Sequence, residues 1–142
     1  MSNEENRTIL CIDDDRGALD YHRALLERSG YLVLTASSAR RGVEIARTCV
    51  ITLVLVDYNM PEMTGDEVAN AIKRVKPTVP VIIVSSDDEI PKAALGQADG
   101  FVLKDKVINL LVPTVIAFCG GNPRGIHESA IAMDRVQAYT GK

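Results

Sequence analysis

The chain is short of the features that mark membrane proteins, secreted proteins and general nucleic-acid binders. No apolar run in its 142 residues reaches the roughly 18 residues that span a bilayer. The polar, acidic N-terminus has no apolar signal region. Lys and Arg number 16 against 19 Asp and Glu, for a net charge of −3, and they form no dense patch. We therefore expect a cytoplasmic protein that crosses no membrane and makes no direct contact with nucleic acid.

Cysteine is scarce and irregularly placed. The three cysteines, Cys11, Cys49 and Cys119, are odd in number and have no metal-ligand spacing. Each lies in or beside an apolar stretch, so we expect buried, reduced thiols. Repeats, low-complexity stretches and internal linkers are also missing, and the length suits one domain with a real core. We predict that this domain covers residues 1–121 and that a C-terminal tail covers 122–142.

What is present is an alternation of strands and helices. Short apolar runs rich in β-branched residues are typical of strands buried on both faces, and segments with apolar residues at helical spacing lie between them. This alternation predicts an α/β fold, with a parallel sheet covered by helices on both faces through right-handed crossovers. The expected strands are 8–12, 31–35, 53–56, 81–84 and 101–103, and the expected long helices are 16–29, 38–47, 64–75 and 107–118.

Three segments depart from this simple pattern. Residues 87–97, which should hold the fourth of five helices, are too short and too broken by Pro91 for a long one, so we expect a short or irregular helix. Pro113 lies inside the last helix and should kink it or delay its start. After a turn signal at 122–125, residues 126–139 could form a short helix that packs on the domain or on a partner.

Aspartates follow two of the buried strands. Asp13, Asp14 and Asp15 come after the first strand, and Asp57 comes after the third. A flavodoxin-like, doubly wound sheet with strand order 2-1-3-4-5 would make these strands neighbours, and ligands bind at such a crevice. Carboxylates so close repel each other unless a cation is present, and a hard ion such as Mg²⁺ suits an oxygen-only site. One of them, most simply Asp15, should instead cap the first helix.

Four motifs together resemble the receiver domain (CheY-like) of bacterial response regulators, over nearly all of residues 7–119. Each motif is a weak signal alone, but all four stand in the right order at strand ends. They are Ile12-Asp13-Asp14-Asp15, Val56-Asp57-Tyr58-Asn59-Met60-Pro61 with Gly65, Val84-Ser85-Ser86, and Phe101-Val102-Leu103-Lys104.

The resemblance implies a phosphorylation switch of a two-component or phosphorelay system. Asp57 would accept a phosphoryl group from a sensor histidine kinase or a histidine phosphotransfer protein, and the change would alter affinity for a partner. Lys104 would reach a phosphoryl oxygen, and Ser85 would move to hydrogen-bond that group. Such a protein catalyses its own phosphorylation and dephosphorylation without turning over an outside substrate. The resemblance also allows a homodimer.

The resemblance further implies a Mg²⁺ site. Asp14, Asp57 and the backbone carbonyl of Asn59 would bind the ion directly, and Asp13 would bind it through a water molecule. Phosphoryl transfer to a carboxylate needs such a cation to neutralise the transferring oxygens, which agrees with the acidic cluster.

Several residues carry a role in the resemblance but also have a simpler interpretation. Asn59 and Asp87 would tune hydrolysis of the acyl phosphate, although Asp87 could equally cap a helix. Phe101 stands where an aromatic residue swings inward on activation, but it could be an ordinary core or edge side chain. Ser85 could be merely the polar end of a strand, and Lys104 a solvated side chain.

The sequence departs from the receiver pattern beside Lys104. Receivers generally continue with a cis proline, whereas Asp105 follows here. A cis bond without proline costs about 2.5–4 kcal/mol, so we expect a trans peptide and a loop that could aim Lys104 differently. The step of 19 residues from Ser85 to Lys104 is also short for the family. In receivers the fourth helix, the fifth strand and the last helix form the face that reads out phosphorylation, so the short segment weakens the expectation of dimerisation or docking through that face.

Two other functions remain open at this point. A pseudo-receiver would use the fold as an interaction module without phosphorylation, which the departures near Lys104 favour. An aspartyl-phosphate phosphohydrolase would explain Asp13 and Asp15 after a strand, but it would leave the Asp57 motif unexplained. The cognate kinase, the pathway, the output and the oligomeric state do not follow from the sequence.

Overall fold

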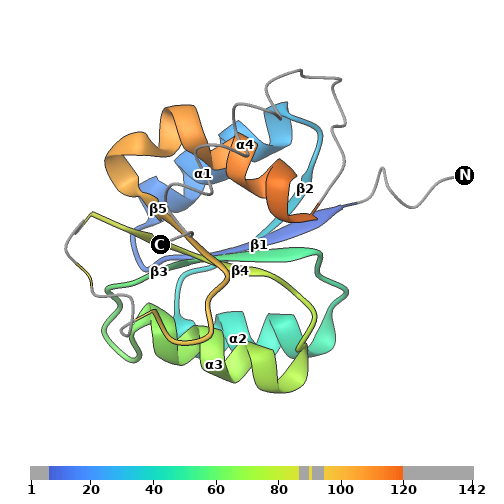
Figure 1. Ribbon diagram of the computed structural model, residues 1–142, viewed down its shortest axis with the longest axis vertical. Helices are drawn as coiled ribbons and strands as arrows, with labels where there is room; N and C mark the ends of the chain where they lie inside the picture. Colours follow the sequence, from blue (N-terminus) through green and yellow to red (C-terminus); the bar gives the residue numbers. More distant parts are fainter. Residues whose placement is uncertain (1–6, 87–89, 91–94, 120–142) are drawn as a thin grey trace, which may run out of the picture.

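Five parallel strands form one sheet between two layers of helices (Figure 1), in a computed structural model that describes residues 7–86, 90 and 95–119. The sheet has the order β2-β1-β3-β4-β5, which confirms the predicted flavodoxin-like topology. Helices α1 (Arg16–Arg28) and α4 (Val107–Cys119) cover one face, and α2 (Ala39–Thr48) and α3 (Gly65–Val75) cover the other. The strands are β1 (Thr8–Ile12), β2 (Leu32–Ala36), β3 (Leu53–Asp57), β4 (Val81–Ser85) and β5 (Gly100–Leu103).

Local hydrogen bonds set where the first helices begin and end. Asp15 caps α1, since its Oδ1 accepts from the backbone N–H of Gly17 at 2.9 Å, as predicted. Ser38 caps α2 by accepting from the backbone N–H of Arg41 at 3.1 Å. The prediction that a strand begins at Tyr31 is wrong by one residue, because the backbone N–H of Tyr31 donates to the carbonyl of Leu26 and closes the end of α1. These caps fix the helices relative to the strand ends that they follow.

The sheet separates two apolar cores, which explains why its central strands are apolar without alternation. Every residue of β3 and β4 is buried, because one side chain faces α1 and α4 and the next faces α2 and α3. The side packed against α1 and α4 includes Ile9, Cys11, Leu53, Leu55, Ile82 and Val84, and the opposite side includes Leu10, Ile12, Val54, Val56, Val81 and Ile83.

Pro113 does not delay the last helix, so this part of the prediction is wrong. Helix α4 begins at Val107 and continues through Pro113 to Cys119. Burial of Val107, Leu111 and Val115 against the core holds the helix on both sides of the proline. The stabilisation from this apolar burial outweighs the preference of proline for a helix start.

Between β4 and β5 the described residues hold no long helix. The segment 95–99 lies against α3 instead, where the backbone N–H of Gln97 donates to Asn70 Oδ1 at 3.0 Å and Asp99 pairs with Lys73 at 2.8 Å. Residues 87–89 and 91–94 lie outside the described part of the chain, so the predicted fourth helix is tested only at its end. The predicted tail, 122–142, and its helix, 126–139, lie outside that part as well.

All three cysteines lie in the described part of the chain. Cys11 is buried and free, whereas Cys49 and Cys119 are free but only half-buried, so full burial was wrong for these two. Both lie at the ends of helices, where the apolar core gives way to solvent. Within the described part of the chain, no helix has the length and apolar character needed to span a membrane.

Candidate functional site

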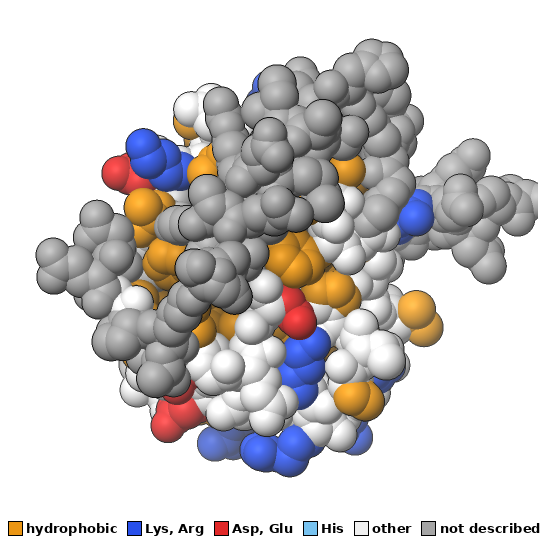
Figure 2. Space-filling model, viewed as in Figure 1, with side chains coloured by type: hydrophobic (Ala, Val, Ile, Leu, Met, Phe, Trp, Pro, Cys, Tyr) orange, Lys and Arg blue, Asp and Glu red, His pale blue; other side chains and the backbone are white. Residues whose placement is uncertain are grey.

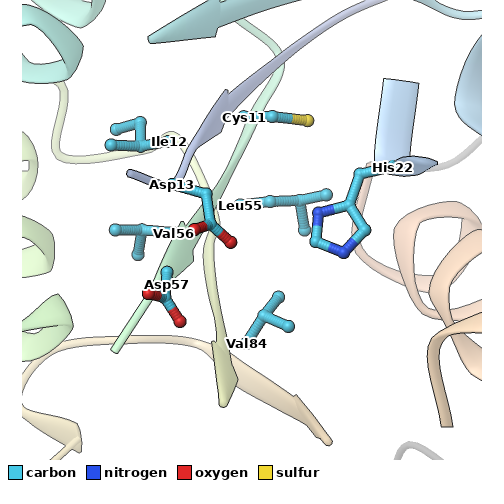
Figure 3. Close-up of a pocket in the computed structure, with 8 residues that line it drawn as sticks. All are labelled: Cys11, Ile12, Asp13, His22, Leu55, Val56, Asp57 and Val84. Carbon is cyan, nitrogen blue, oxygen red and sulfur yellow. The ribbon is translucent and has the colours of Figure 1, made fainter. Parts of the chain in front are cut away.

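Strand register brings the predicted site residues together at one edge of the sheet. Ile12 of β1 pairs with Val56 of β3, so Asp13 and Asp57, one position further on, end neighbouring strands (Figure 3). Asp57 in turn pairs with Val84 of β4. Ser85 pairs with Leu103 of β5, so that Lys104 follows at the same edge. The predicted convergence at the carboxyl ends of the strands is thus confirmed.

The acidic cluster consists of Asp13, Asp14 and Asp57. One carboxylate oxygen from each of the three residues lies within 4.8 Å of the others. Asp13 and Asp57 are only 2% and 5% exposed, whereas Asp14 is exposed to solvent. The Asp13 carboxylate is held in place because its Oδ1 accepts from the backbone N–H of Asp15 at 2.9 Å. The cluster is therefore partly buried but open on the Asp14 side.

Lys104 reaches both buried carboxylates. Its Nζ lies 3.1 Å from Asp57 Oδ1 and 3.2 Å from Asp13 Oδ2. No cis peptide bond occurs among the described residues, so the bond to Asp105 is trans, as predicted. A short 3₁₀ helix, η3 (Lys104–Lys106), follows β5 directly and leads into α4. The missing proline therefore does not turn Lys104 away from the site.

Burial and neighbouring charges shift the pKa values of Asp57 and Lys104. Burial, and then the negative charge of Asp13, raise the pKa of Asp57 above its ordinary value, while Lys104 opposes the rise. For Lys104, desolvation alone would lower the pKa, but the charges of Asp13 and Asp57 outweigh it and raise the pKa. Lys104 therefore carries its positive charge at neutral pH, and this one ammonium faces the carboxyl groups of Asp13 and Asp57.

The donor set fits a hard divalent cation. All the side-chain ligands are carboxylate oxygens, which Mg²⁺ prefers. Asp13 Oδ2 is buried and lies 3.2 Å from Lys104 Nζ. Among the described residues, no donor makes a hydrogen bond of good geometry to this oxygen. Burying a carboxylate oxygen without a hydrogen bond costs free energy of folding, and a cation beside the oxygen would offset that cost.

The other predicted residues lie around this cluster in different environments. Ser85 is fully buried at the end of β4, and Asn59 is exposed in the loop after β3. Phe101 of β5 is half-buried and packs against the core formed with α2 and α3. Asp87 lies outside the described residues. The geometry therefore brings Asp13, Asp14, Asp57 and Lys104 together. Ser85 directly follows Val84, which is the residue of β4 that pairs with Asp57.

Gly65 shapes the loop that leaves the site. The backbone N–H of Gly65 donates to the carbonyl of Tyr58 at 2.8 Å, which folds the loop back onto the end of β3. A Cβ atom on Gly65 would lie 2.8 Å from Tyr58 Cα, so glycine is required by this close approach. The position of Asp57 thus depends on a glycine eight residues further along the chain.

Sequence reasoning missed one residue at the site, His22 of α1. Its side chain is only 4% exposed and points toward Asp13 and Leu55 (Figure 3). Together with Cys11 and Val84 it lines a pocket beneath the acidic cluster that is too small to hold water. Burial lowers the pKa of His22, and the charge of Asp13 opposes this shift. The helical spacing of His22 from the buried Leu19 and Leu26 could have predicted its burial.

Comparisons with known proteins agree on one family. The sequence model of the response regulator receiver domain matches residues 9–115. The transcriptional regulatory protein GlrR of Escherichia coli (strain K12) is 35% identical over 92 residues, which cover 65% of this chain and 21% of GlrR. The chain spans about a fifth of the length of this relative and of the E. coli transcriptional regulatory protein ZraR.

Solved structures give the same result. A response regulator receiver domain from Clostridium thermocellum is 33% identical with a TM-score of 0.63, covering 69% of this chain and 82% of that chain. The response regulator TrrA of Thermotoga maritima, solved in complex with Mg(2+)-BeF, is 25% identical with a TM-score of 0.69. That match covers 77% of this chain and 96% of TrrA.

Proposed function

We propose that this chain, which belongs to the response regulator receiver domain family of two-component systems, is a switch that accepts a phosphoryl group on Asp57 from a phosphohistidine donor. The observation that carries the proposal is the arrangement of Asp57 beside Asp13 with Lys104 Nζ only 3.1 Å from Asp57 Oδ1. A nucleophilic carboxylate, a cation site and a fixed ammonium are what phosphoryl transfer to an aspartate requires.

In the transfer step, a carboxylate oxygen of Asp57 attacks the phosphorus atom of the donor. The new oxygen–phosphorus bond forms as the phosphorus–nitrogen bond breaks, and the electron pair remains on the imidazole nitrogen of the donor, which takes up a proton. Lys104 stabilises the negative charge on a phosphoryl oxygen, since its ammonium already lies between Asp13 and Asp57. Ser85 donates its hydroxyl hydrogen to another phosphoryl oxygen after transfer, which is the switching movement.

Asp13, Asp14 and Asp57 would hold Mg²⁺, with the carbonyl of Asn59 as a further ligand and Asp13 acting through water. The ion supplies positive charge that offsets the negative charge of the transferring group. The acidic cluster supports this assignment, and the 25% identical TrrA was solved in complex with Mg(2+)-BeF. Phe101 would transmit the change by packing, and Asn59 and Asp87 would tune the hydrolysis of the acyl phosphate.

The partners follow from this role. A sensor histidine kinase or histidine phosphotransfer protein would be the donor in the cytoplasm, and phosphorylation would change affinity for a downstream protein or for a second copy. The chain would not turn over an outside substrate. The expectation of no direct nucleic-acid contact finds no support in the relatives, whose names describe transcriptional regulation and of which this chain spans about a fifth. The acidic cluster with Lys104 supports phosphorylation over a pseudo-receiver, and the match to the receiver family over residues 9–115 supports it over a phosphohydrolase.

The test is intact-mass spectrometry after incubation with acetyl phosphate and Mg²⁺. We expect the gain of one phosphoryl group in the wild type and in Asp20→Asn, which changes an exposed aspartate of α1. Asp57→Asn and an EDTA-treated wild type should gain none. Equal gain in Asp57→Asn and wild type would reject Asp57 as the acceptor, and no gain in any sample would favour the pseudo-receiver.

A further inference from the structure

Strand β2 forms one edge of the sheet, with β1 on its inner side (Figure 1). The backbone N–H of Leu32 donates to a carbonyl that precedes β1, and the carbonyl of Ala36 accepts from the N–H that follows β1, so both residues direct their backbone groups inward. Because the direction alternates along a strand, the N–H and C=O groups of Val33 and Thr35 point outward. Within the described part of the chain, no other group pairs with these outward groups.

This edge lacks the features that usually keep edge strands from pairing with other chains. Natural edge strands commonly carry a charged side chain or a proline for this purpose. Residues 29–39, which include all of β2, contain neither. Charge is present elsewhere on the surface, since Lys and Arg gather along the lower edge of the molecule over α3 (Figure 2). The outer edge of β2 is therefore open to a partner strand.

Two leucines add apolar surface to the same edge. Leu32 is 53% exposed and Leu34 is 36% exposed. Both project on the side of the sheet that α2 and α3 cover, because Leu34 pairs with Leu10, a member of that core. No other strand of the described chain exposes a large apolar side chain to this extent. The opposite edge strand, β5, is instead flanked by the charged residues Asp99 and Lys104.

We propose that β2 pairs with β2 of a second copy of this chain, antiparallel about a two-fold axis at Leu34, so that the two sheets join into one. In this register Val33 exchanges both backbone hydrogen bonds with Thr35 of the partner subunit. Leu34 lies opposite Leu34 of the partner subunit as a non-hydrogen-bonded pair, with Cα atoms about 4.5 Å apart. Leu32 lies opposite the small Ala36 of the partner subunit, so large and small side chains meet on this face.

A second copy fits this edge because the strand is complementary to itself. A two-fold axis at Leu34 pairs every outward N–H and C=O group within β2. An axis at Val33 would need the N–H of Tyr31, which already closes the end of α1. An axis at Thr35 would need Ser37, which follows the end of the strand. The register centred on Leu34 is therefore the one that satisfies the edge.

The experiment is disulfide cross-linking of the unphosphorylated full chain, with Cys49→Ser and Cys119→Ser as background. Cys11 stays in place, since it is buried and burial raises the pKa of its thiol to about 12. Leu34→Cys places two thiols at the axis, at a Cα separation that a disulfide spans. The matched control is Leu32→Cys, on the same face and more exposed, whose Cα atoms would lie about 13 Å apart in the paired strands.

We expect Leu34→Cys to form a covalent dimer at least about tenfold faster than Leu32→Cys under mild oxidation, because only the first pair has disulfide geometry. Random collision would favour the more exposed position 32. Equal rates, or faster cross-linking of Leu32→Cys, would overturn the pairing. The pairing needs no phosphoryl group, so its failure would leave the proposed function untouched.

A proline at position 35 tests the same pairing without a cross-link. Thr35→Pro removes an outward N–H and leaves the hydrogen bonds to β1 in place, as edge strands tolerate. In sedimentation equilibrium under reducing conditions, we expect the wild type to dimerise with rising concentration. Thr35→Pro should remain a monomer with an unchanged far-UV circular dichroism spectrum. A wild type that stays monomeric, or a folded Thr35→Pro that dimerises equally well, would overturn the proposal.

Discussion

Replacing Lys104 by methionine should destabilise the metal-free protein by about 2–3 kcal/mol at pH 8. Lys104 Nζ lies 3.1 Å from Asp57 Oδ1 and 3.2 Å from Asp13 Oδ2. With an effective dielectric constant of about 20, each attraction amounts to about 5 kcal/mol before desolvation is subtracted. Removing one partner of a fully buried ion pair costs about 3–5 kcal/mol. The Lys104 side chain is 29% exposed, so solvent screening reduces the expected loss to about 2–3 kcal/mol.

The pH dependence of this loss has a defined sign. The pKa of Lys104 is raised, so its contribution is complete below its ordinary pKa and disappears as the pH rises through the raised value. The pKa of Asp57 is also raised, and below it the Asp57 carboxyl is neutral and its ion pair with Lys104 is lost. The difference between wild type and Lys104→Met should therefore be largest between these two pKa values and shrink on either side.

Urea unfolding in EDTA and in millimolar Mg²⁺ measures the effect. Mg²⁺ should stabilise Lys104→Met more than wild type, because without the ammonium the carboxylates have no other cation beside them in the described part of the chain. Lys106→Met is the matched control, since Lys106 is exposed in the same 3₁₀ helix and should change stability by less than about 0.5 kcal/mol. An equal loss in both variants, or no loss in Lys104→Met, would refute the electrostatic account.

Three further predictions concern residues around the site. Burial lowers the pKa of His22, so the neutral imidazole stabilises the fold above its ordinary pKa, and this stability is lost as the pH falls through the lowered value. In urea titrations, the His22→Leu variant should therefore lose less stability than the wild type between pH 7 and 5. Gly42→Ala should lower stability by about 1–3 kcal/mol in thermal unfolding, because its Cβ would lie within 2.7 Å of Cγ1 of the fully buried Ile12; an unchanged melting temperature would contradict this. Asp15→Ala should cost about 1 kcal/mol through loss of the α1 cap, whereas Asp20→Ala on the exposed side should not; equal effects in urea unfolding would argue against the cap.

The sheet and the acidic cluster could be predicted because their signals are local. Apolar runs such as Leu53–Val56 indicate strands buried on both faces, and alternation with helices then restricts the topology. Once the strand order is fixed, Asp13 and Asp57 must meet at the carboxyl edge. Lys104 also reached its partners although proline was missing, since the short strand β5 alone carries it to that edge.

The sequence predicted that no long helix precedes β5, but it could not predict how residues 95–99 lie, because their conformation depends on distant partners. Gly96 has φ +63°, and a Cβ there would lie 2.9 Å from Asn70 Oδ1. Asp99 pairs with Lys73 and also accepts from the backbone N–H of Val81 at 2.8 Å. Sequence periodicity contains no information on these contacts with α3 and β4.

For His22 and Pro113, position in the helix decides the environment more than residue type does. His22 is polar, but its spacing from Leu19 and Leu26 places it on the buried side of α1. Pro113 predicts a kink or a later helix start from residue type alone, but burial of α4 on both sides of Pro113 keeps the helix start at Val107.

The most direct measurement is to locate the phosphoryl group itself. After incubation with acetyl phosphate and Mg²⁺, borohydride reduces an acyl phosphate on an aspartate to homoserine, which peptide mass spectrometry assigns to one position. The proposed function predicts homoserine at position 57, with none at Asp13 or Asp14 and none without Mg²⁺. Homoserine at another aspartate, or phosphorylation that resists borohydride, would contradict the role of Asp57 as the acceptor.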